Sequence, residues 1–101
     1  MEYQLVMTTA ADESEAAALA RSLVEAGLAA CVQMQPIRSV YRWKGEFRED
    51  SEWRLVAKIM ADRYPEVERH IRERHSYELP EIVSVRIESG SPDYLRWLQG
   101  E

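Results

Sequence analysis

The chain has 101 residues and a hydrophobic content of 46%, which fits one globular domain over residues 1–101 and leaves no room for a second core. Its formal net charge of −5 makes phosphate backbones and anionic lipid surfaces repulsive, so we expect neither nucleic acid nor a membrane as a partner. The only cysteine is Cys31, which excludes an intrachain disulfide, and no secretory signal pattern is present, so the cytoplasm is the expected location.

A strand and a helix are the first predicted elements. The β-branched and aromatic run from Tyr3 to Thr9 predicts the strand. The helix begins after Asp12, whose carboxylate can accept the amide of Glu15 while Glu15 reaches back to form a capping box. Apolar residues recur at helical spacing until Gly27, whose freedom to adopt positive φ ends the helix.

A long β-hairpin arm follows. Apolar residues alternate from Ala29 to Pro36, and because proline cannot donate to a central ladder, it marks either a bend or a sheet edge. The chain turns at Lys44-Gly45, and the alternation resumes from Trp53 to Ile59. A two-stranded arm of this length is marginally stable alone and exposes strand edges, so it predicts contact with a partner.

A second helix, a last strand and a short C-terminal helix complete the chain. The second helix covers residues 62–75, with Pro65 tolerated in its first turn. Apolar residues from Ile82 to Ile87 predict the strand, and the segment from Tyr94 to Leu98 predicts the last helix. The order βαββαβ plus a helix predicts an α+β fold of ferredoxin-like type, an antiparallel sheet covered on one face by two helices.

Motifs of the common enzyme classes are missing from the sequence. The chain contains no G-x-G-x-x-G, Walker loop, G-x-S-x-G, H-E-x-x-H or paired C-x-x-C sequence. No histidine is adjacent to Cys31, so the sequence identifies no activated nucleophile. Small hydrolases share this fold class, but a hydrolase is the last choice here, and we expect a protein that is not an enzyme.

Three stretches of the sequence resemble the CutA family of divalent-cation tolerance proteins. They are Ala29-Ala30-Cys31-Val32 continued by Pro36, Ser39, Tyr41, Trp43, Gly45, Glu52 and Lys58; His75-x-Tyr77-Glu78-x-Pro80-Glu81-Ile82; and Tyr94-Leu95-x-Trp97. The resemblance covers nearly the whole chain, and several ordered motifs at matching spacing are more specific than any one of them. Ser76 and Gln33 depart from the proline and the asparagine of the family pattern.

The resemblance implies a tight homotrimer in which the long hairpin arms pair between subunits. It also implies a cytoplasmic protein that binds copper and other divalent metal ions. Aromatic residues commonly anchor protein interfaces, so we expect Tyr41, Trp43 and Trp53 to lie at the trimer interface.

The expected metal ligands are His75, Glu78 and Met7. An imidazole nitrogen with the carboxylate of Glu78 or Glu81, and with the thioether of Met7 or a donor of a neighbouring subunit, suits a borderline metal such as copper or zinc. A structural or interface role for His75 is the alternative that we favour, because the helix dipole stabilises a histidine at a helix carboxyl end whether or not it binds metal. His70 lies about 140° from His75 around the helix axis, so we expect it at the surface or in an interface.

An intersubunit cleft is the second expected site, with Cys31, Glu52, Lys58, Tyr77 and Glu81 as its residues. Glu52 and Lys58 share a strand face by parity, so they either meet a ligand or another subunit, or form an ion pair that holds the sheet. A free cysteine between small and apolar residues usually behaves as a buried hydrophobe, and we favour that role for Cys31 over ligation.

Two functions follow from these expectations. The first is a homotrimer that binds divalent metal ions and takes part in metal tolerance without catalysis. The second is a trimeric signalling or scaffold protein, similar to the PII regulators in architecture, that binds a small ligand at the subunit interface. Stabilisation by metabolites but not by metal ions would favour the second.

Overall fold

The computed structural model describes residues 2–100, which form a small α+β domain. In chain order its elements are β1 (Tyr3–Ala10), α1 (Glu13–Glu25), β2 (Cys31–Trp43), β3 (Glu46–Met60), the 3-10 turn η1 (Ala61–Arg63), α2 (Tyr64–Arg74), β4 (Val83–Arg86) and α3 (Pro92–Leu98). The predicted βαββαβ order with a C-terminal helix is confirmed.

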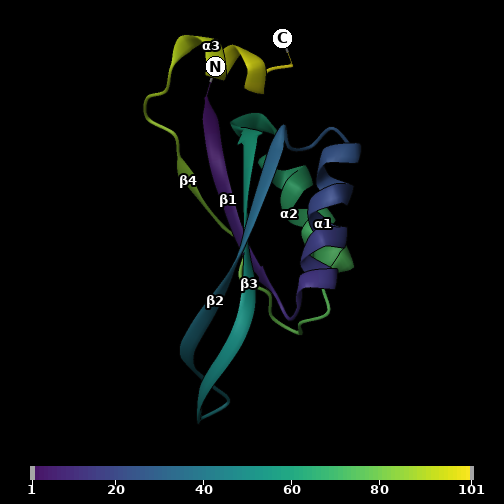
Figure 1. Ribbon diagram of the computed structural model, residues 1–101, viewed down its shortest axis with the longest axis vertical. Helices are drawn as coiled ribbons and strands as arrows, with labels where there is room; N and C mark the ends of the chain where they lie inside the picture. Colours follow the sequence, from purple (N-terminus) through teal and green to yellow (C-terminus); the bar gives the residue numbers. More distant parts are fainter. Residues whose placement is uncertain (1, 101) are drawn as a thin grey trace.

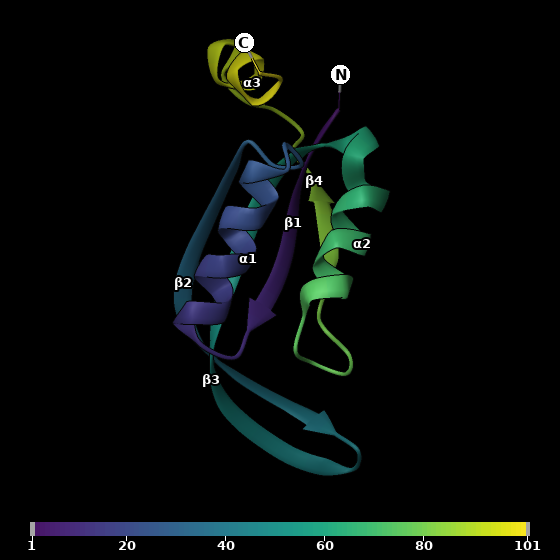
Figure 2. The same cartoon turned by 90° about the vertical axis from the view of Figure 1, so that its right-hand side faces the viewer.

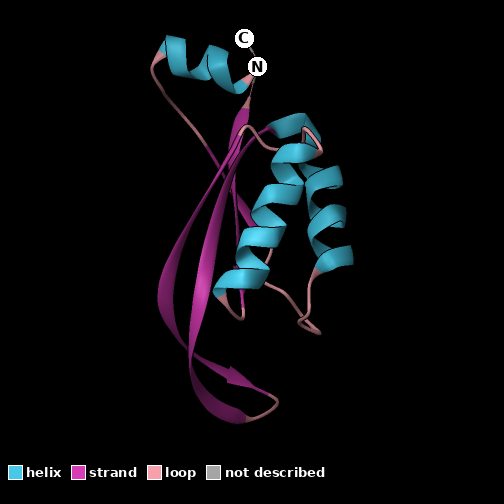
Figure 3. Ribbon diagram, turned by 45° about the vertical axis from the view of Figure 1, so that its right-hand side comes forward, coloured by secondary structure: helices cyan, strands magenta, loops and turns pink. Residues whose placement is uncertain are grey.

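The four strands form one antiparallel sheet in the order β2-β3-β1-β4 (Figure 1). β1 and β2 are joined through α1 but are separated in the sheet by β3, which is the split βαβ arrangement. α1 and α2 lie side by side on one face of the sheet, while α3 lies apart from them at the end opposite the arm (Figures 2 and 3). The other face of the sheet is open along most of its length, and α3 reaches it only at the end away from the arm, where Lys58 of β3 is hydrogen-bonded to Tyr94.

The core lies between the sheet and the two helices that cover it. Its strand residues follow the predicted period of two, since Leu55, Ala57 and Ile59 of β3 are all buried. The helices contribute apolar residues at helical spacing, namely Ala16, Leu19 and Leu23 of α1 and Val67 and Ile71 of α2. Removal of these side chains from water is the main source of stability of the domain.

The face of the sheet opposite α1 and α2, called the open face below, carries exposed apolar residues. The register pairs Leu5 with Val85 and Met7 with Val83, which places these four side chains on the same face. Val83 and Val85 are 49% and 48% exposed. A contiguous apolar face of this kind is typical of a surface that a partner covers.

Of the two hydrogen bonds predicted for the capping box of α1, one is confirmed and the other is wrong. Asp12 Oδ1 accepts a hydrogen bond from the amide of Glu15 at 2.8 Å, as predicted. The Glu15 carboxylate does not reach back to complete a capping box, because it accepts a hydrogen bond from Ser76 Oγ at 2.7 Å. Glu15 therefore ties the start of α1 to the loop that follows α2.

β2 and β3 extend beyond the sheet as the predicted arm (Figure 1). Of the two outcomes expected for Pro36, a bend or an edge, the structure shows the edge, because β2 is an outer strand and continues through the proline to Trp43. Lys44 and Gly45 have positive φ angles of 50° and 80°, the conformation of a two-residue hairpin turn. In Figure 2 the tip of the arm curves beneath the loop that follows α2.

The helices are short, and α2 is shorter than predicted. Its first residues form the separate turn η1, Pro65 occupies the first turn of the α-helix, and the helix ends at Arg74 with His75 as an extended C-cap. β4 likewise covers only the middle of the predicted strand of residues 82–87. Within residues 2–100 there is no helix long and apolar enough to cross a membrane.

Candidate functional site

A cleft of about 760 Å³ lies between the arm and the loop that follows α2. Its walls come from the end of β1, from both strands of the arm and from loop residues 77–81. The charged and aromatic residues of the lining are Arg48; Asp50, Glu52, Glu78 and Glu81; and Tyr41, Trp43 and Tyr77. Four carboxylates against one guanidinium make the cleft acidic, and the three rings give it flat apolar surfaces.

His75 fixes the start of the loop that borders the cleft. Its side chain is completely buried, Nε2 donates to the carbonyl oxygen of Thr9 at 2.6 Å, and Nδ1 accepts from the amide of Tyr77 at 3.1 Å. These two bonds correspond to a neutral imidazole protonated on Nε2, and they use both ring nitrogens. His75 therefore has a structural role in the chain, which is the alternative favoured from the sequence.

Tyr77 connects the same loop to the root of the arm. Its hydroxyl donates a hydrogen bond to Glu52 Oε2 at 2.7 Å. Burial, followed by this hydrogen bond, raises the pKa of Tyr77 well above its ordinary value, so the phenol stays protonated and remains a donor. Glu52 is only 9% exposed and forms no ion pair with any cation of residues 2–100. The uncharged hydroxyl of Tyr77 is therefore the hydrogen-bond donor that stabilises its carboxylate.

The ammonium group of Lys44 lies at the tip of the arm, beside the cleft. Lys44 Nζ is 3.5 Å from Glu78 Oε1 and 5.6 Å from the centroid of the Trp43 ring. These distances correspond to an ion pair and a cation–π contact made by the same ammonium group. The Glu78 carboxylate and the Trp43 indole thus bind an alkylammonium group, here that of Lys44.

Arg48, the one guanidinium among the lining residues of the described part of the chain, is already paired. The Tyr41 hydroxyl donates to the Asp50 carboxylate, which raises the pKa of Tyr41. Arg48 Nη2 lies 3.8 Å from the same Asp50 carboxylate. Glu52 and Glu81 are left as the two lining carboxylates that form no ion pair within residues 2–100.

Each of the three expected metal ligands already has another partner in the chain. Met7 is on the open face of the sheet, where Sδ accepts a hydrogen bond from Arg54 at 3.1 Å. Glu78 pairs with Lys44, and both nitrogens of His75 are hydrogen-bonded. No group of three or more His, Cys, Asp or Glu side chains in residues 2–100 is placed to hold a metal ion. The donors of a single chain therefore do not fit a ready-made metal site.

The five residues predicted for an intersubunit cleft divide into two groups. Three of them line the cleft beneath the arm, namely Glu52, Tyr77 and Glu81. The other two, Cys31 and Lys58, are opposite each other where β2 enters the sheet, and Cys31 is half-buried. Lys58 Nζ donates to the Tyr94 hydroxyl at 2.9 Å, and this hydrogen bond raises the pKa of Lys58. The ion pair between Lys58 and Glu52 is thus not formed in the chain.

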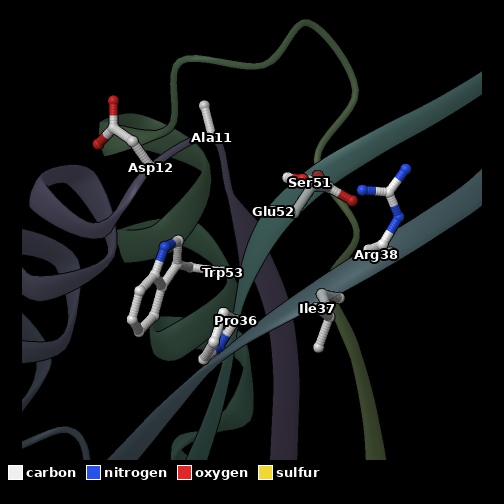
Figure 4. A pocket seen from close by; sticks show the side chains of 8 residues that line it. All are labelled: Ala11, Asp12, Pro36, Ile37, Arg38, Ser51, Glu52 and Trp53. Carbon is white, nitrogen blue, oxygen red and sulfur yellow. The ribbon is translucent and has the colours of Figure 1, made fainter.

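Trp53 lies near the root of the arm and lines a smaller hollow of about 480 Å³ (Figure 4). Its indole lies beside Pro36, the residue opposite it in β2, and packs against the hydrophobic core. Tyr41 and Trp43, the other two residues predicted for the trimer interface, line the cleft. Trp53 therefore contributes to the core of the single chain, whereas Tyr41 and Trp43 remain available to a ligand or a partner.

His70 was expected at the surface or in an interface, and the surface position is wrong. His70 is 9% exposed and lies between α2 and α1, where Nε2 donates to Ser22 Oγ at 2.8 Å and that hydroxyl donates to the carbonyl oxygen of Leu19. Burial, and then the charge of Arg74, lower the pKa of His70. The angle around the helix correctly separates His70 from His75, but it does not show that α1 packs on the His70 side.

Arg48, which lines the cleft, and Lys44, which lies beside it, were not predicted as site residues. The pairing of the hairpin strands could have identified Arg48. Counted outward from the turn, the register places Arg48 opposite Tyr41, on the same face of the arm. Lys44 sits in the turn itself, so strand parity gives no indication of where its side chain points. Its contact with Glu78 depends on the curvature of the arm, which no local pattern in the sequence encodes.

Comparisons with known proteins agree on one family. A family model described as CutA1 divalent ion tolerance protein matches residues 4–101. The divalent-cation tolerance protein CutA of Thermus thermophilus is 39% identical over 97 residues, which cover 95% of this chain and 94% of that protein. Protein CutA of Mus musculus is 40% identical over 91 residues, which cover 89% of this chain but 51% of the mouse protein, so the chain spans about half of that relative.

A solved structure gives the same result for the fold. The structure of the periplasmic divalent cation tolerance protein CutA from Archaeoglobus fulgidus matches with a TM-score of 0.95 at 32% identity. The match covers 97% of this chain and 96% of that chain. The arm, the sheet and the helices therefore have the same arrangement in both proteins.

Proposed function

This chain belongs to the CutA1 divalent ion tolerance family, and we propose that it is a homotrimer that binds divalent metal ions, copper among them, without catalysing a reaction. The observation that best supports metal binding is the cleft beneath the arm, whose lining carries four carboxylates and one guanidinium. Such a lining concentrates divalent cations and supplies the oxygen ligands that they accept. A cytoplasmic location is part of the proposal and is supported by the free thiol of Cys31.

The proposed metal ligands are still Glu78, His75 and Met7, and a different change is needed before each can bind a metal ion. Glu78 lies in the cleft and can exchange the ammonium of Lys44 for a metal ion at little cost, because ion pairs as exposed as this one are weak. His75 must release the amide of Tyr77 before Nδ1 can act as a ligand. Met7 lies on the open sheet face, so its thioether would serve a site formed between subunits.

Two surfaces support the trimer. The open face of the sheet exposes Val83 and Val85, and the arm exposes Val40, Tyr41 and Phe47, of which Phe47 is 72% exposed. Burial of such apolar surface between subunits stabilises an assembly by roughly 25 cal/mol per Å². Sedimentation or light scattering at micromolar concentration should give a mass near three subunits. A monomer under these conditions would rule the trimer out.

Calorimetric titration of the metal-free protein with copper and zinc tests metal binding. The wild type should bind saturably, and Glu78→Gln should weaken binding because it removes the carboxylate charge from the cleft. Glu49→Gln is the matched control, since Glu49 is a carboxylate of the same arm that pairs with Arg38 and does not line the cleft. No binding by the wild type, or equal affinity of all three proteins, would contradict the proposal.

Small-ligand binding in the manner of the PII regulators is the second candidate function. The observation that favours it is the size of the cleft, because about 760 Å³ is far more than one metal ion occupies and falls within the range of small-molecule sites. A shift of the melting temperature with metabolites but not with metal ions would favour this function over the first.

A further inference from the structure

We infer that the cleft beneath the arm binds a small organic cation with two or more ammonium groups, of the linear diamine or triamine class. The inference deepens the second candidate function and rests on it, since it names the chemical class of the small ligand. Its test uses metal-free protein, so the outcome does not depend on metal binding. Four features of the cleft lead to it: an internal ammonium group, a buried carboxylate without a cation, the spacing of the acids and the apolar surface between them.

The internal ammonium group is that of Lys44. Its Nζ is held between the Glu78 carboxylate at 3.5 Å and the Trp43 ring at 5.6 Å. A carboxylate combined with an aromatic face is the arrangement that recognises organic cations. Both members of the Lys44–Glu78 pair are largely exposed, at 66% and 70%, so the lysine can be displaced by an ammonium group of a ligand.

The buried carboxylate is that of Glu52 at the root of the arm. It is 9% exposed, lines the cleft and receives one hydrogen bond from the neutral hydroxyl of Tyr77. No cation of residues 2–100 forms an ion pair with it. A buried carboxylate is costly without a compensating charge, and a ligand ammonium group in the cleft would provide that charge.

The spacing of the acids favours a ligand with separated charges. Tyr77 and Glu78 are adjacent in the loop, yet Tyr77 contacts Glu52 at the root of the arm and Glu78 contacts Lys44 at its tip. No three His, Cys, Asp or Glu side chains of residues 2–100 converge on one point, so the carboxylates of the cleft can each meet a separate positive charge. Two ammonium groups joined by an alkyl chain match two carboxylates at the two ends of one cleft.

The surface between these ends suits the alkyl chain and does not suit an anion. Val40 and Leu79 line the cleft and are 61% and 69% exposed, so methylene groups can cover them. Among residues 2–100, Arg48 is the only cation that lines the cleft, and it already pairs with Asp50. A phosphate or carboxylate ligand would meet four negative groups and no free positive one.

Calorimetric titration of chelator-treated protein with spermidine, a linear triamine, tests the inference. Spermidine should bind saturably and more tightly than butylamine, which has the alkyl chain and a single ammonium group. Glu52→Gln should weaken spermidine binding roughly tenfold or more, because it removes a buried charge partner of the ligand. Circular dichroism and sedimentation of each variant check that the fold and the assembly are retained.

Lys44→Gln is the decisive variant because we expect it to strengthen spermidine binding, whereas most substitutions at a binding site weaken it. Removal of the competing ammonium frees Glu78 and Trp43, so spermidine should bind about two- to fivefold more tightly, the range expected for loss of an exposed ion pair. Arg38→Gln is the matched control, since it removes the same charge from the arm but Arg38 pairs with Glu49 outside the cleft. Its spermidine affinity should stay near that of the wild type.

Three results would overturn the inference: no saturable binding of spermidine, an affinity unchanged or weakened by Lys44→Gln, or an equal gain from Arg38→Gln, which would indicate attraction by net charge alone. Because metal is removed by chelation, failure with spermidine leaves the copper and zinc titrations unaffected. Binding of spermidine by a protein that binds neither metal would remove the first proposed function and keep the second.

Discussion

Replacement of His75 by alanine should destabilise the protein severely whether or not metal is present. The substitution empties the site of a completely buried ring and leaves the Thr9 carbonyl and the Tyr77 amide without their partner. Each unpaired buried group costs about 1–3 kcal/mol, and the cavity adds to this, so we expect a loss of roughly 3–5 kcal/mol. That is a large share of the roughly 5–15 kcal/mol that stabilises a typical domain.

Urea denaturation at fixed protein concentration measures this loss, because assembly makes the apparent stability depend on concentration. Glu73→Ala is a suitable control, since Glu73 is an exposed residue of the same helix and such substitutions change stability by less than about 0.5 kcal/mol. A loss below about 1 kcal/mol for His75→Ala would refute the structural role. If the large loss is found, disappearance of copper binding in this variant is not evidence that His75 is a ligand.

Three further predictions concern other buried polar groups. Thr8→Val should stabilise the protein by about 1 kcal/mol in urea denaturation, because the buried Thr8 hydroxyl has no hydrogen-bond partner among residues 2–100. Tyr77→Phe should destabilise it by about 1–3 kcal/mol in the same assay, because the buried Glu52 carboxylate loses its hydrogen bond. His70→Gln should reduce the pH dependence of the urea midpoint between about pH 7.5 and 5.5. Burial lowers the pKa of native His70 below the unfolded value of 6.5, so the unfolded chain binds more protons and wild-type stability falls as the pH drops below about 6.5.

Each of these predictions has a clear contrary result. Destabilisation by Thr8→Val would mean that the hydroxyl has a partner in solution. If Tyr77→Phe is no more destabilising in the presence of Glu52 than in a Glu52→Gln background, the two side chains are not coupled. If the wild type and His70→Gln lose stability equally on acidification, another group titrates.

The sequence predicted the fold because each element carries a local signal. The alternation through Leu55, Ala57 and Ile59 identifies the buried face of β3, and Asp12 identifies the start of α1. Gly45 identifies the turn of the arm. Only the ends of the elements differed, because they depend on tertiary packing at the termini of helices and strands.

The candidate site was predictable only in part, because its geometry comes from contacts distant in the sequence. Glu52, Tyr77 and Glu81 were expected in one cleft, and the structure places them together. Glu52 and Lys58 share the parity of β3, but six positions along a strand of 3.3 Å rise separate their side chains by about 20 Å. The hydrogen bond of His75 Nε2 could not be predicted either, because its acceptor Thr9 lies 66 residues away in the chain.

Anomalous diffraction at the copper absorption edge, from crystals of the assembled protein grown with copper, is the most direct test of divalent-metal binding in the cleft. We expect a copper peak within the cleft, in contact with the Glu78 carboxylate and with the ammonium of Lys44 displaced. Copper peaks confined to surface residues outside the cleft, with the Lys44–Glu78 pair intact, would contradict the proposed metal site.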